Sequence, residues 1–475
     1  MNTFIKINLS RTIKSVYAYL TNFLSSKLFL SATVVLFIFQ TVYIAVSTRY
    51  GIPPDESFHF DLIKLYTESG VSPFLQNQDG YYFLGEVVRT PFYLYHWLLS
   101  LPFHFVQNIE NSYIFLRFIN ILIGLGSLFV LYKISNVLKL PALVRNVSLF
   151  MFCNTLMFVF LTSAISYDNL FILLSLLGMY YILLVREDFA LKNVLILILI
   201  FCAGLLTKVT FIPVLLILGV MLAHQMYQKK VKLRKFVKLD FSEHRALNTL
   251  LVVMIACFIG LIIESYGYNI INYGSYKPSC TQVLELEQCQ ENGLFVRNSA
   301  IYEYDRRTAE LSTFEYFFDW AFLTQSRTLG VHAHKQIDAF KPALLLLQAL
   351  MAIWFVLLIR FFDNKDKAMI MVISFATLYA LIVFIENNSI YNSVGRPSFA
   401  VHGRYLFPSL PLLYLFGNYF FINSIRSKLL KITYLMIVVV VFLVSSLPHY
   451  ICRTSTEWQT KKFEQISVKL KSLRD

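Results

Sequence analysis

Long apolar runs dominate the sequence. Several extend for about 20 residues, the length that an α-helix needs to cross the hydrocarbon core of a bilayer. Because no water satisfies backbone polar groups there, such runs are expected to be helices, whose hydrogen bonds are internal. Of the 475 residues, 57% are hydrophobic and only 15% are charged, whereas a soluble domain is about 25% charged. The sequence therefore predicts an all-α polytopic membrane protein.

About eleven runs have the length and composition of membrane-spanning helices. They cover residues 28–48, 113–132, 142–162, 168–185, 190–206, 209–226, 248–267, 342–360, 368–386, 405–423 and 432–449. The first run lacks a small-residue cleavage site, so we expect a retained helix and not a removed signal peptide. The chain then divides into an N-terminal segment (1–27), a transmembrane domain (28–450) and a C-terminal tail (451–475).

The basic residues cluster in short segments between apolar runs. The net charge is +14, and the densest cluster lies between residues 229 and 245. This is the positive-inside pattern of a membrane protein, and it places the N-terminus in the cytoplasm. It also argues against nucleic acid as a partner. The basic C-terminal tail is an exception, because an odd number of helices places it outside.

Two segments on the outside are too long to be simple connections. They cover residues 49–112 and 268–341, and loops of that length are usually functional. In the first, residues 57–66 have the apolar spacing of an amphipathic helix at the membrane surface, and residues 91–106 are expected to be interfacial or re-entrant. In the second, Cys280 and Cys289 either form a disulfide, which requires an oxidising compartment, or remain thiols.

The first candidate for chemistry is Pro53-Pro54-Asp55-Glu56-Ser57-Phe58-His59, directly after the first run. Asp55 is expected to cap the following helix. His59 lies three and four residues after the two acids, so it can meet either one. Two carboxylates with an imidazole suit general-base chemistry. The alternative is a solvated helix start, where acids are favoured by the helix dipole.

Two further candidates lie in outside turns. Asp168 and Asn169, within Ser166-Tyr167-Asp168-Asn169, either form a turn and helix cap or belong to the same site as Asp55. Lys208 is a cation at membrane depth, which is a functional hypothesis by default. The alternative for Lys208 is a side chain that extends to the interface.

A late motif supplies an arginine and a tyrosine at the start of the tenth run. In His402-Gly403-Arg404-Tyr405-Leu406-Phe407-Pro408, Arg404 has the planar fork that binds phosphate, next to a helix N-terminus that attracts anions. The alternative is an arginine that anchors the helix at the lipid headgroups.

The second long outside segment adds Arg327, His332 and His334. The two histidines lack a third and fourth ligand, so we expect ordinary polar loop residues and no metal. All of these candidates fall on the outside face, whereas the cytoplasmic loops offer only Lys and Arg. The coincidence favours one shared site.

Taken in order along the chain, these motifs resemble the GT-C superfamily of integral membrane glycosyltransferases. The resemblance rests on the Asp-Glu after the first run, Thr90-Pro91-Phe92-Tyr93-Leu94-Tyr95, Leu116-Arg117-Phe118-Ile119-Asn120, Tyr167-Asp168-Asn169, Leu206-Thr207-Lys208-Val209-Thr210 and Gly403-Arg404-Tyr405-Leu406-Phe407-Pro408. It covers about residues 28–450. The pairing of Pro-Asp-Glu-x-x-His with Gly-Arg-Tyr-x-x-Pro is similar to a bacterial branch of GT-C-like proteins related to protein O-mannosyltransferases and aminoarabinose transferases.

The resemblance implies an enzyme of the bacterial inner membrane that acts on its periplasmic or exterior face. A hexosyl or pentosyl group would pass from a polyprenyl-phosphate carrier to a surface glycan or lipid-linked acceptor, such as O-antigen. By the same resemblance, Asp55 is the catalytic base and Glu56 its helper or alternate. Arg404 and Lys208 hold the carrier phosphate. No Asp-x-Asp motif is present, so we expect chemistry without a metal or other cofactor.

Three other functions stay open. A transporter would carry repeats, broken helices and ionisable groups near the midplane, and no repeat is visible in the sequence. A polymerase or ligase of lipid-linked glycans would act on the same face, but would lack the early acidic pair. A scaffold would not need Asp55, Glu56, Lys208 and Arg404 on one side.

Overall fold

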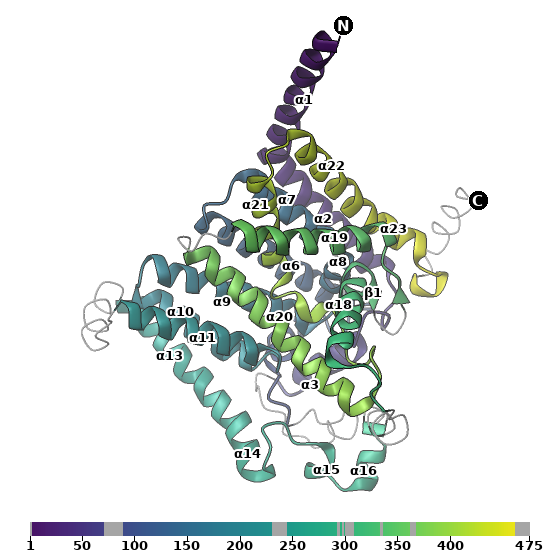
Figure 1. Cartoon of the computed structure of the whole chain (residues 1–475). Helices are drawn as coiled ribbons and strands as arrows, with labels where there is room; N and C mark the ends of the chain where they lie inside the picture. Colours follow the sequence, from purple (N-terminus) through teal and green to yellow (C-terminus); the bar gives the residue numbers. More distant parts are fainter. Residues whose placement is uncertain are drawn as a thin grey trace.

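The computed structural model describes residues 2–70, 89–229, 245–291, 295, 296, 299, 308–332, 336–361 and 367–460. Almost all regular structure in these residues is helical (Figure 1). The exception is a short antiparallel pair, β1 (Val331–His332) with β2 (Gln336–Ile337), and one isolated bridge between Thr48 and Gln459. The predicted all-α membrane architecture is confirmed.

Within the described residues, seven helical segments are long and apolar enough to cross a membrane. They are α2 (Lys27–Ser47), α6 (Tyr113–Val137), α9 (Tyr167–Glu187), α11 (Phe211–Gln228), the segment Arg245–Tyr273, α20 (Lys367–Val394) and the segment Lys428–Arg453. The segment Arg245–Tyr273 combines α13 (Arg245–Ile262), a π-helical turn (Ile263–Gly267) and α14 (Tyr268–Tyr273). The segment Lys428–Arg453 combines α22 (Lys428–Ser445) and α23 (Leu447–Arg453).

The remaining predicted runs are also helical but are not among these seven segments. The run 142–162 is divided into α7 (Ala142–Cys153) and α8 (Leu156–Thr162), which meet at 66° and would make an eighth span if counted together. The other three form α10 (Leu191–Leu205), α19 (Lys341–Phe361) and α21 (Leu410–Ser424). The described residues therefore support seven or eight spans by length and composition, and the count of eleven is not confirmed.

One buried amide joins two helix breaks. Gln40 of α2 donates from Nε2 to Asn154 Oδ1 (3.0 Å) at the break between α7 and α8. Its Oε1 accepts from Leu447 N (3.3 Å) and from the Ser446 hydroxyl, at the break between α22 and α23. Backbone groups freed at a break inside a bilayer need internal partners. Gln40 accepts a hydrogen bond from a backbone N–H at the break between α22 and α23. At the break between α7 and α8 it binds the Asn154 side chain.

Close helix contacts use small residues, and large apolar side chains face outward. Gly417 of α21 lies against the Trp354 ring of α19, with no space for a Cβ atom. Small residues allow this close approach between helices in membranes. On the outside, α13 exposes Leu250, Val253 and Ile259. An exposed apolar face of this kind fits lipid as the surrounding medium.

Several short elements between the long helices lie toward the end of the bundle away from α1 (Asn2–Ser25) (Figure 1). We call it the α3 end. They are α3 (Glu56–Glu68), α5 (Leu94–Phe103), α15 (Cys280–Val283), α16 (Leu286–Gln290), α18 (Thr313–Leu329) and two 3₁₀ turns, η2 (Gly403–Leu406) and η3 (Thr456–Trp458). The predicted amphipathic segment is α3, which packs on α5. A disulfide joins Cys280 to Cys289.

Candidate functional site

Four charged side chains from distant parts of the sequence meet at the α3 end. Arg404 Nη2 lies 3.1 Å from Asp55 Oδ2, and Arg404 Nε lies 3.5 Å from Asp168 Oδ2. Lys208 Nζ donates to Asp168 Oδ1. We call these four residues the ion cluster. The prediction that the motifs around Asp55, Asp168, Lys208 and Arg404 share one face is confirmed by these contacts.

The members of the ion cluster differ sharply in exposure. The side chains of Asp168, Lys208 and Arg404 are buried, whereas that of Asp55 is 43% exposed. Lys208 does not extend to the interface, because its Nζ lies under the rings of Tyr167 (4.6 Å) and Tyr405 (4.9 Å). The cluster is therefore reached from outside through Asp55.

Arg404 has unused hydrogen-bonding capacity. Its Nε and Nη1 are buried without a hydrogen-bond partner, and the contact of Nε with Asp168 is an ion pair only. Burial disfavours the charged form, but the nearby Asp168, Tyr405 and Asp55 outweigh it and raise the pKa of Arg404. A guanidinium that is always charged and has idle N–H groups is suited to a further anion.

Lys208 forms an ion pair with one carboxylate, that of Asp168. Burial lowers the pKa of Lys208, while the ion pair with Asp168 acts in the opposite direction. Two carboxylates and two cations make the ion cluster neutral as a whole.

Asp55 stands at the N-cap position of α3 but does not cap it. Its backbone is left-handed (φ 56°) and its side chain makes no capping hydrogen bond, so the capping prediction is wrong. A capping side chain requires extended backbone at this position. The Asp55 carboxylate contacts Arg404 instead. Left-handed backbone at a non-glycine residue costs free energy and is concentrated at functional sites.

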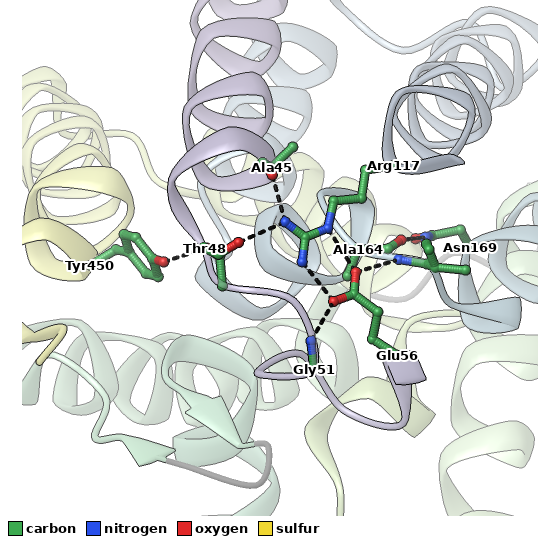
Figure 2. Close-up of polar contacts among 9 residues, drawn as sticks. Ala45, Thr48, Gly51, Glu56, Arg117, Ala164, Asn169 and Tyr450 are labelled. Atoms are coloured by element: carbon green, nitrogen blue, oxygen red, sulfur yellow. Dashed lines mark hydrogen bonds and ion pairs between the residues drawn. The ribbon is translucent and has the colours of Figure 1, made fainter. Parts of the chain in front are cut away.

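Glu56, the next residue, is fully closed off. Arg117 Nε donates to Glu56 Oε1 (2.7 Å) and Arg117 Nη2 donates to Oε2 (2.6 Å), and neither side chain is exposed (Figure 2). The backbone N–H of Gly51 donates to Oε2 (3.2 Å), and that of Ile165 donates to Oε1 (3.3 Å). Glu56 therefore has no oxygen free to take a proton from a substrate.

Arg117 extends this closed pair into the membrane helices. Its Nη1 donates to the carbonyl oxygens of Ala45 (2.6 Å) and Thr48 (2.8 Å) at the end of α2 (Figure 2). The pair thus fixes the α2–α3 corner, and with it the backbone that carries Asp55. The sequence analysis did not select Arg117 as a site residue, although a cation entering an apolar run was a usable signal.

His59 meets neither carboxylate. Its Nδ1 lies 2.9 Å from Nε2 of His96 on α5, and its Nε2 is buried without a partner. Burial lowers the pKa of His59 to about 4, despite the nearby carboxylates of Asp55 and Asp168. The prediction that His59 meets an acid of its own helix is wrong. His96 was missed; its signal was an imidazole that interrupts an apolar aromatic stretch.

Asn169 belongs to a structural network beside the ion cluster. Its Nδ2 donates to Asn120 Oδ1 (2.8 Å) and to the Leu161 carbonyl (2.9 Å), and Tyr95 donates to the same Asn120 oxygen (2.9 Å). The network joins α5, α6 and α9. Ser166 accepts a hydrogen bond from the Asp168 N–H (3.3 Å) and caps α9. The turn-and-cap alternative thus has the cap in the right segment, but the capping residue is Ser166 and not Asp168 or Asn169.

Arg327 supports the segment that leads into η2. Its Nη1 donates to the carbonyl oxygens of Ser398 (2.9 Å) and Val401. Gly403 lies directly on the α18 backbone, where a Cβ atom would overlap Arg327 and Thr328. Arg327 therefore positions Arg404 through the backbone instead of contacting Asp55 or Asp168.

Among the described residues, no group of three or more His, Cys, Asp and Glu side chains is arranged to hold a metal ion. His332 lies beside His402, with ring centres 5.3 Å apart. His334 lies outside the described residues. A cavity of about 630 Å³, lined by residues 336–342, His449 and Arg453, contains none of the ion-cluster residues.

No family model and no curated protein matches this chain.

Proposed function

We propose that this protein is an integral membrane glycosyltransferase of the GT-C type. It transfers a sugar from a polyprenyl-phosphate carrier to a hydroxyl of a surface glycan or lipid-linked acceptor. The proposal rests chiefly on one observation: a half-exposed carboxylate, Asp55, contacts a buried guanidinium, Arg404, in which two nitrogens have no hydrogen-bond partner. A base and an anion site side by side are what this transfer requires.

The reaction follows from these two groups. Asp55 accepts the proton of the acceptor hydroxyl as its oxygen bonds to the anomeric carbon of the donor sugar. The bond between that carbon and the phosphate oxygen breaks, and the polyprenyl phosphate leaves with the electron pair. Arg404 and Lys208 stabilise the negative charge that grows on the leaving phosphate. Asp168 keeps both cations in place when no donor is bound.

Glu56 and Arg117 act as positioning residues in this proposal. The bidentate pair fixes the corner between α2 and α3, and this corner determines where the Asp55 carboxylate lies. Tyr405 covers Lys208, and Arg327 supports the segment before Arg404. Asn169 supports the start of α9.

The location proposed is a bacterial inner membrane, with the α3 end facing the periplasm or exterior. The disulfide between Cys280 and Cys289 supports an oxidising side for that end. The basic segment 229–245 fits the cytoplasmic side. The single crossing α2 separates α1 from α3, and counting α7/α8, α10, α19 and α21 as crossings beside the seven segments gives the eleven proposed spans.

The experiment is a gene deletion in the native bacterium, followed by mass spectrometry of its surface glycans. The proposal predicts that one sugar residue disappears on deletion and returns with the wild-type gene. An unchanged glycan in cells that express the wild-type protein contradicts the proposal.

Transport is the second candidate, and one observation favours it. The broken helix pair α7/α8, joined through Gln40 to the interruption between α22 and α23, is a feature that transporters use at their binding sites. If deletion leaves glycans unchanged, substrate uptake by the same pair of strains is the next assay.

A further inference from the structure

A pair of hydrogen-bonded histidines lies beside the ion cluster, and Asp55, Asp168, Lys208 and Arg404 all act on it electrostatically. His59 on α3 and His96 on α5 are each 2% exposed, with His59 Nδ1 and His96 Nε2 2.9 Å apart. The ring of Tyr167 lies 4.6 Å from the His59 ring and 6.2 Å from the His96 ring, and Lys208 Nζ lies 4.6 Å from the same Tyr167 ring. One aromatic ring therefore separates the histidine pair from the ion cluster.

A neutral imidazole has one N–H and one bare nitrogen, so the pair allows two arrangements. In the first, His59 Nδ1–H donates to His96 Nε2. His59 Nε2 is then unprotonated, and His96 carries its single ring N–H on Nδ1. In the second, His96 Nε2–H donates to His59 Nδ1; His59 then carries a proton on Nε2 and His96 Nδ1 is bare. The contact on the far side of His96 distinguishes them.

That contact is the backbone carbonyl of Phe92, one helical turn earlier. It interacts with the His96 ring as a hydrogen-bond acceptor and acts to raise the pKa of His96, against the larger lowering by burial. Its geometry falls short of a full hydrogen bond to Nδ1. A carbonyl oxygen can only accept, so it favours a proton on His96 Nδ1 and would repel a bare nitrogen there. This favours the first arrangement.

His59 is then left with a bare Nε2 that is buried and has no partner. A buried acceptor without a donor is costly, and native proteins satisfy nearly all such groups. Burial also lowers the pKa of His59 to about 4, so the ring stays neutral at physiological pH and accepts from a donor. A neutral hydrogen-bond donor at Nε2 would satisfy this nitrogen.

We infer that His59 Nε2 accepts a hydrogen bond from a hydroxyl group of the carbohydrate substrate, and that His96 is the positioning residue that fixes His59 in the required tautomer. The inference rests on the proposed function and adds a hydroxyl subsite to its base and its anion site. The hydroxyl belongs to the donor sugar or to the acceptor.

The first test reads the tautomer without using activity. Wild-type protein in lipid nanodiscs, with histidine labelled with nitrogen-15, should show a neutral His59 with a bare Nε2; the signal is assigned by its loss in His59→Leu. In His96→Leu, His59 loses its acceptor and this signal should change, whereas in His96→Gln the amide oxygen can still accept. A proton on His59 Nε2 in the wild type would overturn the inference.

The second test measures sugar transfer by variants at both positions. His96→Leu and His59→Leu should each lower transfer on the order of tenfold, the scale of one hydrogen bond, and His96→Gln should restore most of it. The double variant should be no worse than His59→Leu, because His96 acts through His59. His449→Leu is the matched control: a buried histidine of the same end, bonded to the Asp338 carbonyl, whose loss should leave transfer unchanged.

The outcomes separate the two ideas. Wild-type transfer by His96→Leu, or additive losses in the double variant, overturns the histidine inference while the function stands. Deletion of the gene without any change in glycans removes the function, and the hydroxyl subsite with it, whatever tautomer is found. Donor analogues that lack one hydroxyl identify the source: if the donor sugar fills the subsite, one analogue should be transferred equally by wild type and His59→Leu, and if the acceptor fills it, none should.

Discussion

Two neighbouring acids, Asp55 and Glu56, each contact an arginine, but the two pairs are built differently. In the Glu56–Arg117 pair both side chains are fully buried, and both carboxylate oxygens have partners. In the Asp55–Arg404 pair the acid is 43% exposed and two guanidinium nitrogens have no hydrogen-bond partner. The first arrangement can only hold the structure together. The second still has capacity for a ligand, and this difference assigns their roles.

The comparison also explains why the two acids stand side by side. The carboxylate of Glu56 anchors the corner between α2 and α3. The preceding residue, Asp55, has a left-handed backbone, and its side chain contacts Arg404. A precise position for a reactive group needs a rigid support. The closed pair supplies this support to the open one.

The largest expected effect is on folding, from Arg117→Leu. The substitution leaves the Glu56 carboxylate buried without its cation, which costs about 3–5 kcal/mol. We expect a large loss of folded protein, measured by thermal unfolding in detergent and by the yield of monodisperse protein. Arg327→Leu, at a half-buried arginine on the same end of the bundle, is the control and should unfold at a temperature much nearer the wild type. Equal losses of stability in both variants would contradict the distinction between Arg117, which neutralises a buried carboxylate, and Arg327, which binds backbone carbonyls.

The next effect is on transfer, from Asp55→Asn. Loss of the base should lower the rate about 10²–10⁴-fold, while thermal stability should change by no more than about 1 kcal/mol, because an exposed ion pair contributes little. Asparagine is the suitable substitution, since it tolerates the left-handed backbone. Transfer kinetics and thermal unfolding on one preparation check both parts. A large fall in stability would mean that Asp55 is structural, like Glu56.

Arg404→Lys should have a smaller effect on transfer, on the order of 10²-fold. Lysine keeps the charge beside Asp168 but lacks the planar fork with its idle N–H groups. The loss should fall mainly on kcat if the fork serves the leaving phosphate, and steady-state kinetics with varied donor would show it. An increase in KM alone would instead indicate that Arg404 binds the donor without stabilising charge in the transition state.

The smallest effect should come from Tyr450→Phe. The Tyr450 hydroxyl lies 2.6 Å from Thr48 Oγ1, next to the carbonyl that Arg117 holds (Figure 2). Loss of this hydrogen bond should cost about 1 kcal/mol of stability and leave transfer unchanged. Thermal unfolding and the transfer assay together measure it. A marked loss of transfer without loss of stability would extend the reactive region to α23.

Much of this site could be predicted from the sequence, because membrane topology sorts residues by side. Asp55, Asp168, Lys208 and Arg404 all stand where an apolar run begins or ends, and counting the runs placed them on one face. Their ion pairs bear this out. Helix identity was also visible from apolar runs, since a bilayer leaves the backbone few other choices.

Contacts between distant segments were not visible. Arg117 lies 61 residues from Glu56 and His96 lies 37 residues from His59, and no spacing rule connects such pairs. The helical rule for residues three and four apart instead predicted that His59 meets an acid. It failed because His96 on the packed neighbour α5 occupies His59 Nδ1.

The number of spans stays a prediction, because the run 142–162 is broken and three further helices, α10, α19 and α21, lie outside the seven counted segments. Side chains such as Asn154 and Gln40 satisfy the backbone where a helix breaks, so an apolar run need not be one straight helix. The run 142–162 contains such a break. Hydropathy alone does not distinguish a broken helix from a continuous one.

The most direct test compares Asp55→Asn with Glu56→Gln in the native bacterium after gene deletion. Each substitution removes one negative charge with almost no change in shape, at adjacent positions. Surface glycans are measured by mass spectrometry and membrane-inserted protein by quantitative immunoblot. The account predicts normal protein without the sugar for Asp55→Asn, and reduced protein with the sugar still added in proportion for Glu56→Gln. Normal glycan in a strain that contains only Asp55→Asn would contradict it.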